Sequence, residues 1–514
     1  MVIEWLSESI SDGAKSVIVL GSIDSLTISE LSKEFSMGIL LFSSKKETIS
    51  PLPEEVTFVD RKESASLIKE KLENFMLLDY NSPPTVKVCK SITDESTEEY
   101  NKILDLTISE IDSTMRARRT RSETGYLRQK QIFINLAGYL TKRMPSEWSA
   151  LAQGTLAIVV GAGPSLDITL PLLKSGIPKP LIVASDSSLR ALRDANLDPD
   201  FVISIDPQKT FESCSEQDYS PGIAVLSSQS HESWSKKWGK KCCYLSGRVI
   251  TEDWLTEKGI SKTDFLAINN AGLTALLFAN SLNPAALLTL GMDLSGGVDG
   301  KERYAENTHR SHIQVFASHY HNIPGNFSDT VPTPFLSDWQ ETSDFCRKIS
   351  ENKTIINLND RGAKLEGATL VHPDQVEELK GALNQSLKPY NSAELNLLSK
   401  RKTLRGHGLN QLLCQLTAVC DSIWDVFPKE ENENNSILLN FLRETLADYD
   451  KAKLLGDFAF SVMPIISPKK EPNLQELKRF TNEIKDLIWK LEDAIIACSP
   501  EDEFLSRFFT EKFN

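Results

Sequence analysis

The chain has 514 residues, of which 57 are Lys or Arg and 71 are Asp or Glu, and its formal net charge is −14 at pH 7. This length is greater than one ordinary core requires and predicts about two to four domains. The acidic balance argues against a nucleic-acid-binding protein, because such proteins owe their affinity to the neutralisation of phosphates.

The cysteines and the apolar residues indicate a soluble protein of a reducing compartment. The eight cysteines form no CxxC pattern, so we expect reduced thiols rather than a disulfide framework or a metal site. Acidic residues such as Glu4 and Glu8 stand where a secretory signal would be basic. The longest apolar stretch, 273–290, is interrupted by Asn280 and Pro284, which are costly in a lipid-facing helix. We therefore expect a cytoplasmic protein without a membrane span.

Residues 1–95 predict a small N-terminal α/β domain. Apolar runs at 17–21, 38–42 and 56–59 are typical of buried strands, and helical stretches lie between them. Gly21 follows the first run but lacks the glycine spacing of a nucleotide-binding loop. We expect this domain to act as a scaffold.

Residues 96–150 predict a helical connector that is rich in arginine. Two interpretations of this basic cluster remain open: a solvated helix face that pairs with the protein's own carboxylates, or a wall that attracts anions towards an active site. The arginines concerned are Arg116, Arg118, Arg119, Arg121 and Arg128.

Residues 151–375 predict the catalytic domain, in which strands and helices alternate. Strands at 156–160, 181–184 and 201–205 are separated by short helices, which indicates two successive βαβ units of a doubly wound, Rossmann-like parallel sheet. Ligands bind such sheets beyond the carboxyl ends of the strands. Further strands are predicted at 223–226, 242–245, 265–268, 285–290 and 354–357, with helices at 271–282 and 335–349.

A glycine loop follows the first of these strands. Gly161, Gly163, Pro164 and Ser165 stand where the strand turns into a helix, and amide groups at such a turn favour an anion such as a nucleotide phosphate. The loop is neither a P-loop, because no Gly-Lys-Ser/Thr follows, nor a nucleophile elbow, because Asp167 replaces the final glycine. We expect Gly163 to leave room for the phosphate, so that a larger side chain abolishes binding without unfolding the protein. The alternative is that the glycines only permit a tight turn.

Polar residues after the other strands are further candidates for ligand contacts. Each has a structural alternative, as for Asp186, which is suited either to contact a nucleoside or to cap a helix. These candidates are Asp186, Ser187, Asp206, Asn270, Gly272, Asp293 and Tyr304.

The long polar segment 295–334 contains His309, His312, His319 and His321. A loop of this length inside a domain is usually a lid or a binding loop. Histidine titrates near neutral pH and is suited to act as a general base, and we predict His321, or else His319, in that role. Solvated loop histidines and a zinc site are the alternatives.

Residues 376–514 predict a helical C-terminal domain, because leucines and isoleucines recur there at helical spacing. We expect this domain to serve packing or partner binding.

The central residues resemble the motility-associated-factor (Maf) family of bacterial flagellin glycosyltransferases over about 110–375. The resemblance rests on GAGPSLD, ASDSS, DPDFVISIDP, LTLGMDLSGG followed by Tyr304-Ala305, and NLNDRGAKLEGA, in this order. The central domain of that family looks like the bacterial sialyltransferases, which use a CMP-activated nonulosonic acid. The resemblance implies that Gly161–Ser165 hold the CMP phosphate and that Asp186 takes the place of a nucleotide-binding asparagine. It also implies that Tyr304 matches a phosphate-contacting tyrosine.

The resemblance therefore implies a cytoplasmic glycosyltransferase that moves a nonulosonic acid, of pseudaminic or legionaminic type, from CMP to Ser or Thr of flagellin and supports motility. No cofactor is expected, and a divalent metal is not indicated. Two alternatives remain: a pterin pyrophosphokinase that uses ATP and Mg²⁺, and a non-catalytic flagellin-binding chaperone. The oligomeric state is not predicted.

Overall fold

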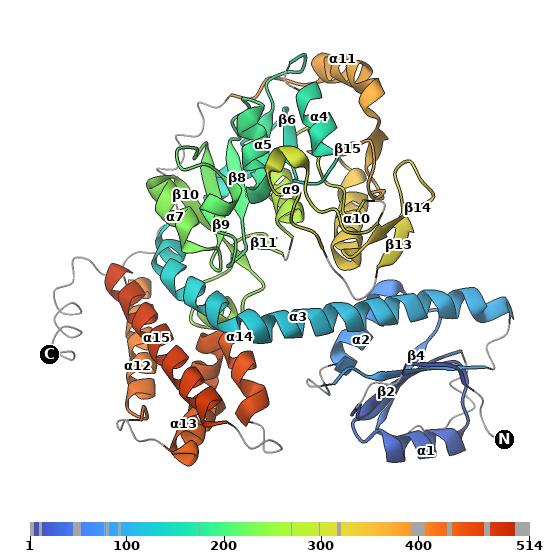
Figure 1. Ribbon diagram of the computed structural model, residues 1–514, viewed down its shortest axis with the longest axis vertical. Coiled ribbons are helices and arrows are strands. Elements are labelled where there is room, and N and C mark those ends of the chain that lie inside the picture. Colours follow the sequence, from blue (N-terminus) through green and yellow to red (C-terminus); the bar gives the residue numbers. More distant parts are fainter. Residues whose placement is uncertain are drawn as a thin grey trace. The chain divides into compact units, whose positions relative to one another are not determined.

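The chain forms two compact units, Met1–Arg121 and Ser122–Asn514, which are considered separately. The computed structural model is drawn in Figure 1. It describes residues 5–9, 13–44, 53–76, 78, 82–90, 94–173, 175–268, 270–297, 299–315, 320–391, 407–428, 434–466 and 473–498.

The first unit contains a five-stranded sheet in the order β1-β5-β2-β3-β4. Ile18 and Leu20 face one core while Val17 and Val19 face another, as the twofold alternation of a strand buried on both faces requires. The predicted α/β fold of this region is confirmed, although the sequence prediction missed the first and last strands. The elements are β1 (Trp5–Ser9), β2 (Ser16–Leu20), α1 (Ser25–Glu34), β3 (Gly38–Ser43), β4 (Val56–Asp60), α2 (Ala65–Met76), β5 (Thr85–Cys89) and the start of α3 (Asp94–Thr141).

The second unit is built on a nine-stranded sheet in the order β11-β10-β9-β8-β7-β6-β12-β15-β16. All neighbouring strands in it are parallel. The chain moves outward from β6 to β11 and then returns to the other side of β6 with β12, which confirms the predicted doubly wound sheet. The strands are β6 (Leu156–Val160), β7 (Leu181–Ser185), β8 (Phe201–Ser204), β9 (Ile223–Ser227), β10 (Cys242–Gly247), β11 (Leu266–Ala267), β12 (Ala286–Leu290), β15 (Thr354–Leu358) and β16 (Thr369–Val371).

Helices cover both faces of this sheet. Ala157 and Val159 of β6 pack with α9 and α10 on one face, and Leu156 and Ile158 pack with α4, α5 and α11 on the other. The helices of this layer are α4 (Leu166–Leu172), α5 (Leu189–Asp194), α6 (Phe211–Cys214), α7 (Glu232–Trp238), α8 (Ile250–Glu257), α9 (Ala271–Ser281), α10 (Leu336–Ser350) and α11 (Val376–Ser386).

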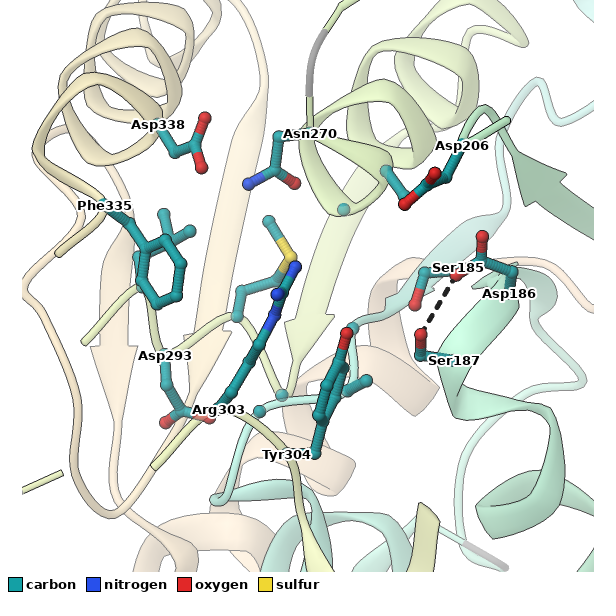
Figure 2. Close-up of a pocket in the computed structure, with 18 of the residues that line it drawn as sticks. Ser185, Asp186, Ser187, Asp206, Asn270, Asp293, Arg303, Tyr304, Phe335 and Asp338 are labelled. Atoms are coloured by element: carbon teal, nitrogen blue, oxygen red, sulfur yellow. Dashed lines mark hydrogen bonds between the residues drawn. The ribbon is translucent and has the colours of Figure 1, made fainter. Parts of the chain in front are cut away.

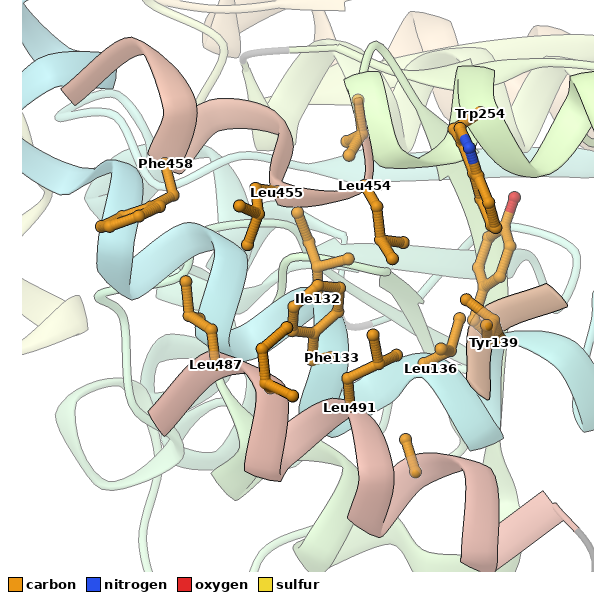
Figure 3. Packing of buried hydrophobic residues seen from close by; sticks show 14 of the residues in the cluster. Ile132, Phe133, Leu136, Tyr139, Trp254, Leu454, Leu455, Phe458, Leu487 and Leu491 are labelled. Carbon is orange, nitrogen blue, oxygen red and sulfur yellow. The ribbon is translucent and has the colours of Figure 1, made fainter. Parts of the chain in front are cut away.

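The C-terminal helices share a core with the sheet. Figure 3 shows Leu455 and Phe458 of α14 and Leu487 of α15 packed against Ile132 and Phe133 of α3. The same cluster continues to side chains of β8, β9 and β10. The predicted packing role of this region thus has a physical basis, and a cut near residue 385 would expose a large part of the core of the second unit. The helices are α12 (His407–Trp424), α13 (Asn435–Ala447), α14 (Tyr449–Ile466) and α15 (Leu474–Cys498).

Those arginines of the predicted cluster whose contacts are described bind other groups of the protein. Arg118 donates to the carbonyl oxygen of Met76, and Arg128 lies 3.0 Å from a carboxylate oxygen of Asp457. These contacts favour the interpretation in which the arginines pair with other parts of the chain.

The segment 295–334 contains one feature that the sequence prediction missed, the antiparallel hairpin of β13 (His321–Pro324) and β14 (Thr330–Thr333). The eight cysteines are free thiols. Within the described residues, no helix is both long and apolar enough to cross a membrane.

Candidate active site

A pocket with a cavity volume of about 170 Å³ lies at the carboxyl edge of the nine-stranded sheet. Residues that follow β6, β7, β8 and β12 and the first turn of α9 surround it (Figure 2). It lies at the point where the strand order reverses between β6 and β12, where ligands of doubly wound sheets bind. The predicted ligand contacts that line it are Gly161, Gly163, Asp186, Ser187, Asp206, Asn270, Gly272, Asp293 and Tyr304.

Pro164 and Ser165 do not line the pocket, and the glycine loop is bound tightly to the strand beside it. The N–H groups of Gly161 and Gly163 donate to the carbonyl oxygens of Leu290 and Gly291 at 2.8 and 2.9 Å. The N–H of Ser165 donates to Asp293 Oδ2 at 3.1 Å. These three amides therefore already have acceptors at or just after the end of β12, and binding of a phosphate by the loop stays a prediction.

The glycines of this loop allow it to lie close to the residues that follow β12. A Cβ on Gly161 would clash with the carbonyl oxygen of Gly291, and a Cβ on Gly163 would clash with the Asp293 carboxylate. The space next to Gly163 is thus filled by the protein itself. The expectation that it leaves room for a phosphate is corrected accordingly.

Replacement of Gly163 by valine is therefore expected to lower the free energy of unfolding, by about 1–3 kcal/mol or more, because the buried strand end must move to accommodate it. Urea denaturation followed by circular dichroism measures this loss. Gly381→Ala in α11 is the matched control, since a Cβ there has nothing within 4 Å and alanine is the better helix former. A Gly163→Val protein as stable as the wild type, with nucleotide binding lost, would contradict the correction.

Asp293 joins three segments of the site. Its Oδ2 accepts hydrogen bonds from the N–H and hydroxyl of Ser165 at 3.1 and 3.0 Å, and its carbonyl oxygen accepts the N–H of Ala363 at 2.7 Å. Gly362, with φ of 77°, packs directly against its side chain. Burial raises the pKa of Asp293 to about 6, although the Ser165 hydrogen bonds act in the opposite direction. The glycine loop, the LSGG segment and the NDRGA segment therefore meet at this one carboxyl group.

Asp186 holds a buried ion pair. Its Oδ1 accepts Lys209 Nζ at 2.9 Å and the Ser187 hydroxyl at 3.1 Å, and its Oδ2 accepts the Ser204 hydroxyl at 3.1 Å. The Asp186 side chain is 1% exposed and that of Lys209 is 12% exposed. Burial alone would lower the pKa of Lys209, but the Asp186 carboxylate raises it above its usual value. Neither predicted role of Asp186 describes this arrangement, in which its side chain positions a lysine at the pocket wall.

Several residues that line the pocket were missed by the sequence analysis. Lys209 follows the Asp206-Pro207 turn, and Arg303 directly precedes Tyr304, so a search for cations beside the predicted contacts would have found both. The guanidinium carbon of Arg303 lies 5.1 Å from the centre of the Tyr304 ring and 5.8 Å from that of Phe335. Asp338, in the first turn of α10, completes this wall (Figure 2).

The histidines lie elsewhere. His321 is on β13 opposite Thr333 and does not line the pocket, while His319 lies outside the described residues. His309 Nε2 is 3.2 Å from Asp194 Oδ2, and both side chains are more than half exposed. His312 is exposed. The part of the chain that the structure describes contains no group of three or more His, Cys, Asp or Glu suited to hold a metal ion.

Comparisons with known proteins were made for the whole chain. Residues 130–298 match the family described as 6-hydroxymethylpterin diphosphokinase MptE-like. Among solved structures, the chain is similar to a Maf glycosyltransferase from Magnetospirillum magneticum AMB-1, with a TM-score of 0.49 and 15% identity over 96% of this chain and 80% of that one. No curated protein matches the sequence significantly.

Proposed function

We propose that this chain is a glycosyltransferase of Maf type, which transfers a nonulosonic acid from its CMP-activated donor to Ser or Thr of flagellin and so supports flagellar assembly. The observation that carries the proposal is the pocket at the reversal of strand order, which gathers residues from every motif of the resemblance except the last, NLNDRGAKLEGA, around one opening. The similarity to a Maf glycosyltransferase agrees with this assignment.

The pocket offers groups for a negatively charged donor on one side. Tyr304 is 8% exposed, and its hydroxyl points into the pocket (Figure 2). The first turn of α9, with Asn270 as its N-cap, adds the positive end of an eleven-residue helix. In the proposed reaction these groups hold the CMP phosphate, which leaves with the electron pair of the broken glycosidic bond.

The acceptor hydroxyl attacks the anomeric carbon in this reaction and must lose its proton to a base. His321 and His319 remain candidates from the sequence. Asp338 and Asp206 are candidates from the structure, since they line the pocket and neither is used, as Asp293 is, to bind the glycine loop.

The family match supports a second candidate function, a diphosphokinase that transfers a diphosphoryl group from ATP with Mg²⁺. That chemistry requires carboxylates to hold the metal. Two of the four carboxylates at the pocket, Asp186 and Asp293, already accept hydrogen bonds from Lys209 and Ser165. These internal contacts make the glycosyltransferase the better-supported function.

A ligand screen distinguishes the candidates. We expect CMP to raise the melting temperature of the full-length protein, by about 2–4 °C or more at saturation, and ATP with Mg²⁺ to leave it unchanged. The second test incubates the protein with a CMP-nonulosonic acid and purified flagellin and measures the intact mass of the flagellin. A shift with ATP and Mg²⁺ alone would favour the diphosphokinase, and flagellin binding without any nucleotide effect would favour the chaperone.

A further inference from the structure

Arg303 is a cation held in place by aromatic rings rather than by carboxylates. Figure 2 shows its side chain extended between Tyr304 and Phe335, in agreement with the distances of 5.1 and 5.8 Å to their ring centres. An arginine stacked in this way keeps its N–H groups available, because ring faces contact the guanidinium plane and not its donors. Among the residues that the structure describes, none forms an ion pair or a hydrogen bond with it.

The neighbouring cations differ from Arg303 in this respect. Lys209 lines the same pocket but its ammonium group is neutralised by Asp186 at 2.9 Å. Arg310, which also lies 5.0 Å from the centre of the Tyr304 ring, donates to the carbonyl oxygen of Ser213. Within the described part of the chain, Arg303 is therefore the pocket cation whose charge is not compensated.

A second observation, the environment of the Tyr304 hydroxyl, also favours an oxyanion next to this arginine. Tyr304 is more than nine-tenths buried, yet its hydroxyl points into the pocket (Figure 2) and has no hydrogen-bond partner among the described residues. A hydroxyl that faces a pocket and has no partner in the protein is available to donate to an acceptor on a ligand. The first turn of α9 forms part of the same wall through Ala271 and Gly272, and a helix N-terminus favours negative charge.

We infer that Arg303 binds an oxyanionic group of the nucleotide ligand and thereby selects an anionic donor over a neutral one. The inference rests on the proposed function for the identity of that ligand. Two groups of a CMP-nonulosonic acid have this chemistry, the phosphate and the carboxylate of the sugar, and the planar guanidinium fits either of them through two parallel hydrogen bonds.

Calorimetric titration of the full-length Arg303→Gln protein tests the inference with cytidine, CMP and CMP-N-acetylneuraminic acid. We expect affinity for the CMP-sugar to fall about 10- to 100-fold, while affinity for cytidine is unchanged. A loss that extends to CMP assigns the phosphate to Arg303, whereas a loss confined to the CMP-sugar assigns the carboxylate. Arg303→Lys keeps the charge and should restore part of the affinity.

Arg479→Gln is the matched control, because Arg479 is also an exposed arginine beside an aromatic ring, 4.4 Å from the centre of Phe480 on α15, but does not line the pocket. It should bind every ligand as the wild type does. Equal affinities of Arg303→Gln and wild type, or an equal loss for cytidine, would overturn the inference.

The proposed function fails separately if the wild-type protein binds ATP but no cytidine nucleotide. The inference is then tested by comparing the affinities for ATP and adenosine. Only a loss of affinity for ATP, with the affinity for adenosine unchanged in Arg303→Gln, supports it. A wild-type protein that binds none of these ligands would contradict both.

Discussion

Replacing Lys209 by methionine is expected to destabilise the second unit by about 3–5 kcal/mol, because the substitution leaves the Asp186 carboxylate buried without its counter-charge. Asp186 is 1% exposed, and the hydroxyls of Ser187 and Ser204 cannot neutralise it. The double variant Lys209→Met/Asp186→Asn should recover much of this loss, since it removes both charges. Urea denaturation of the wild type, Lys209→Met, Asp186→Asn and the double variant gives the coupling free energy of the pair.

Lys236→Met is the matched control for that cycle. Lys236 pairs with Glu232 four residues earlier on the helix, but its side chain is 70% exposed, so its removal should change stability by less than about 0.5 kcal/mol. If Lys209→Met were as mild as this control, the pair would be a solvated contact and Lys209 would be free to meet a ligand phosphate.

The position of the pocket could be predicted from the sequence because it depends on topology. Apolar runs such as Leu156–Val160 and Ala286–Leu290 are typical of buried strands, and their alternation with helices indicates a parallel sheet. All strands of such a sheet end at one edge, so residues after them gather there. Gly161, Asp186 and Asn270 were found by this rule and do line the pocket.

The use of each residue could not be predicted in the same way, because it depends on which element lies beside it. The sequence gives no sign that β12 runs next to the glycine loop, and so the amides of Gly161 and Gly163 were expected to meet a ligand instead of Leu290 and Gly291. The partner of Asp186 was missed for the same reason, since Lys209 is 23 residues away along the chain. Hydrogen-bond partners follow from tertiary packing, which single-sequence patterns do not contain.

The packing partners of the C-terminal helices could not be predicted from the sequence either. Helical periodicity identified α12 to α15 because each has an apolar face, but it does not say what covers that face. In the structure α3 and α8 cover much of it, through residues such as Phe133 and Trp254. An independent helical domain and a helical layer of the same core give the same sequence pattern.

Asp338→Asn is expected to reduce the rate of sugar transfer about 10²- to 10⁴-fold and to retain the affinity for CMP. Such a result would identify Asp338 as the general base. A base must reach the acceptor hydroxyl directly or through one water. Asp338 lines the pocket from the first turn of α10, beside Phe335 and across from Asn270 (Figure 2). Asp206, which also lines the pocket and whose carboxylate accepts the N–H of Gln208 at 2.9 Å, is the comparison variant.

The pH profile of transfer distinguishes a carboxylate base from the histidine that the sequence suggests. A histidine base loses activity as the pH falls through about 6.5, whereas an aspartate base retains it down to about 4. We expect His321→Ala to retain most of the activity and to keep the acid side of the wild-type pH profile, since burial already gives Asp293 of the same site a pKa of about 6. If His321→Ala lost transfer while Asp338→Asn did not, the hairpin β13–β14 would have to approach the pocket when the acceptor binds, and the histidine of the sequence prediction would be the base.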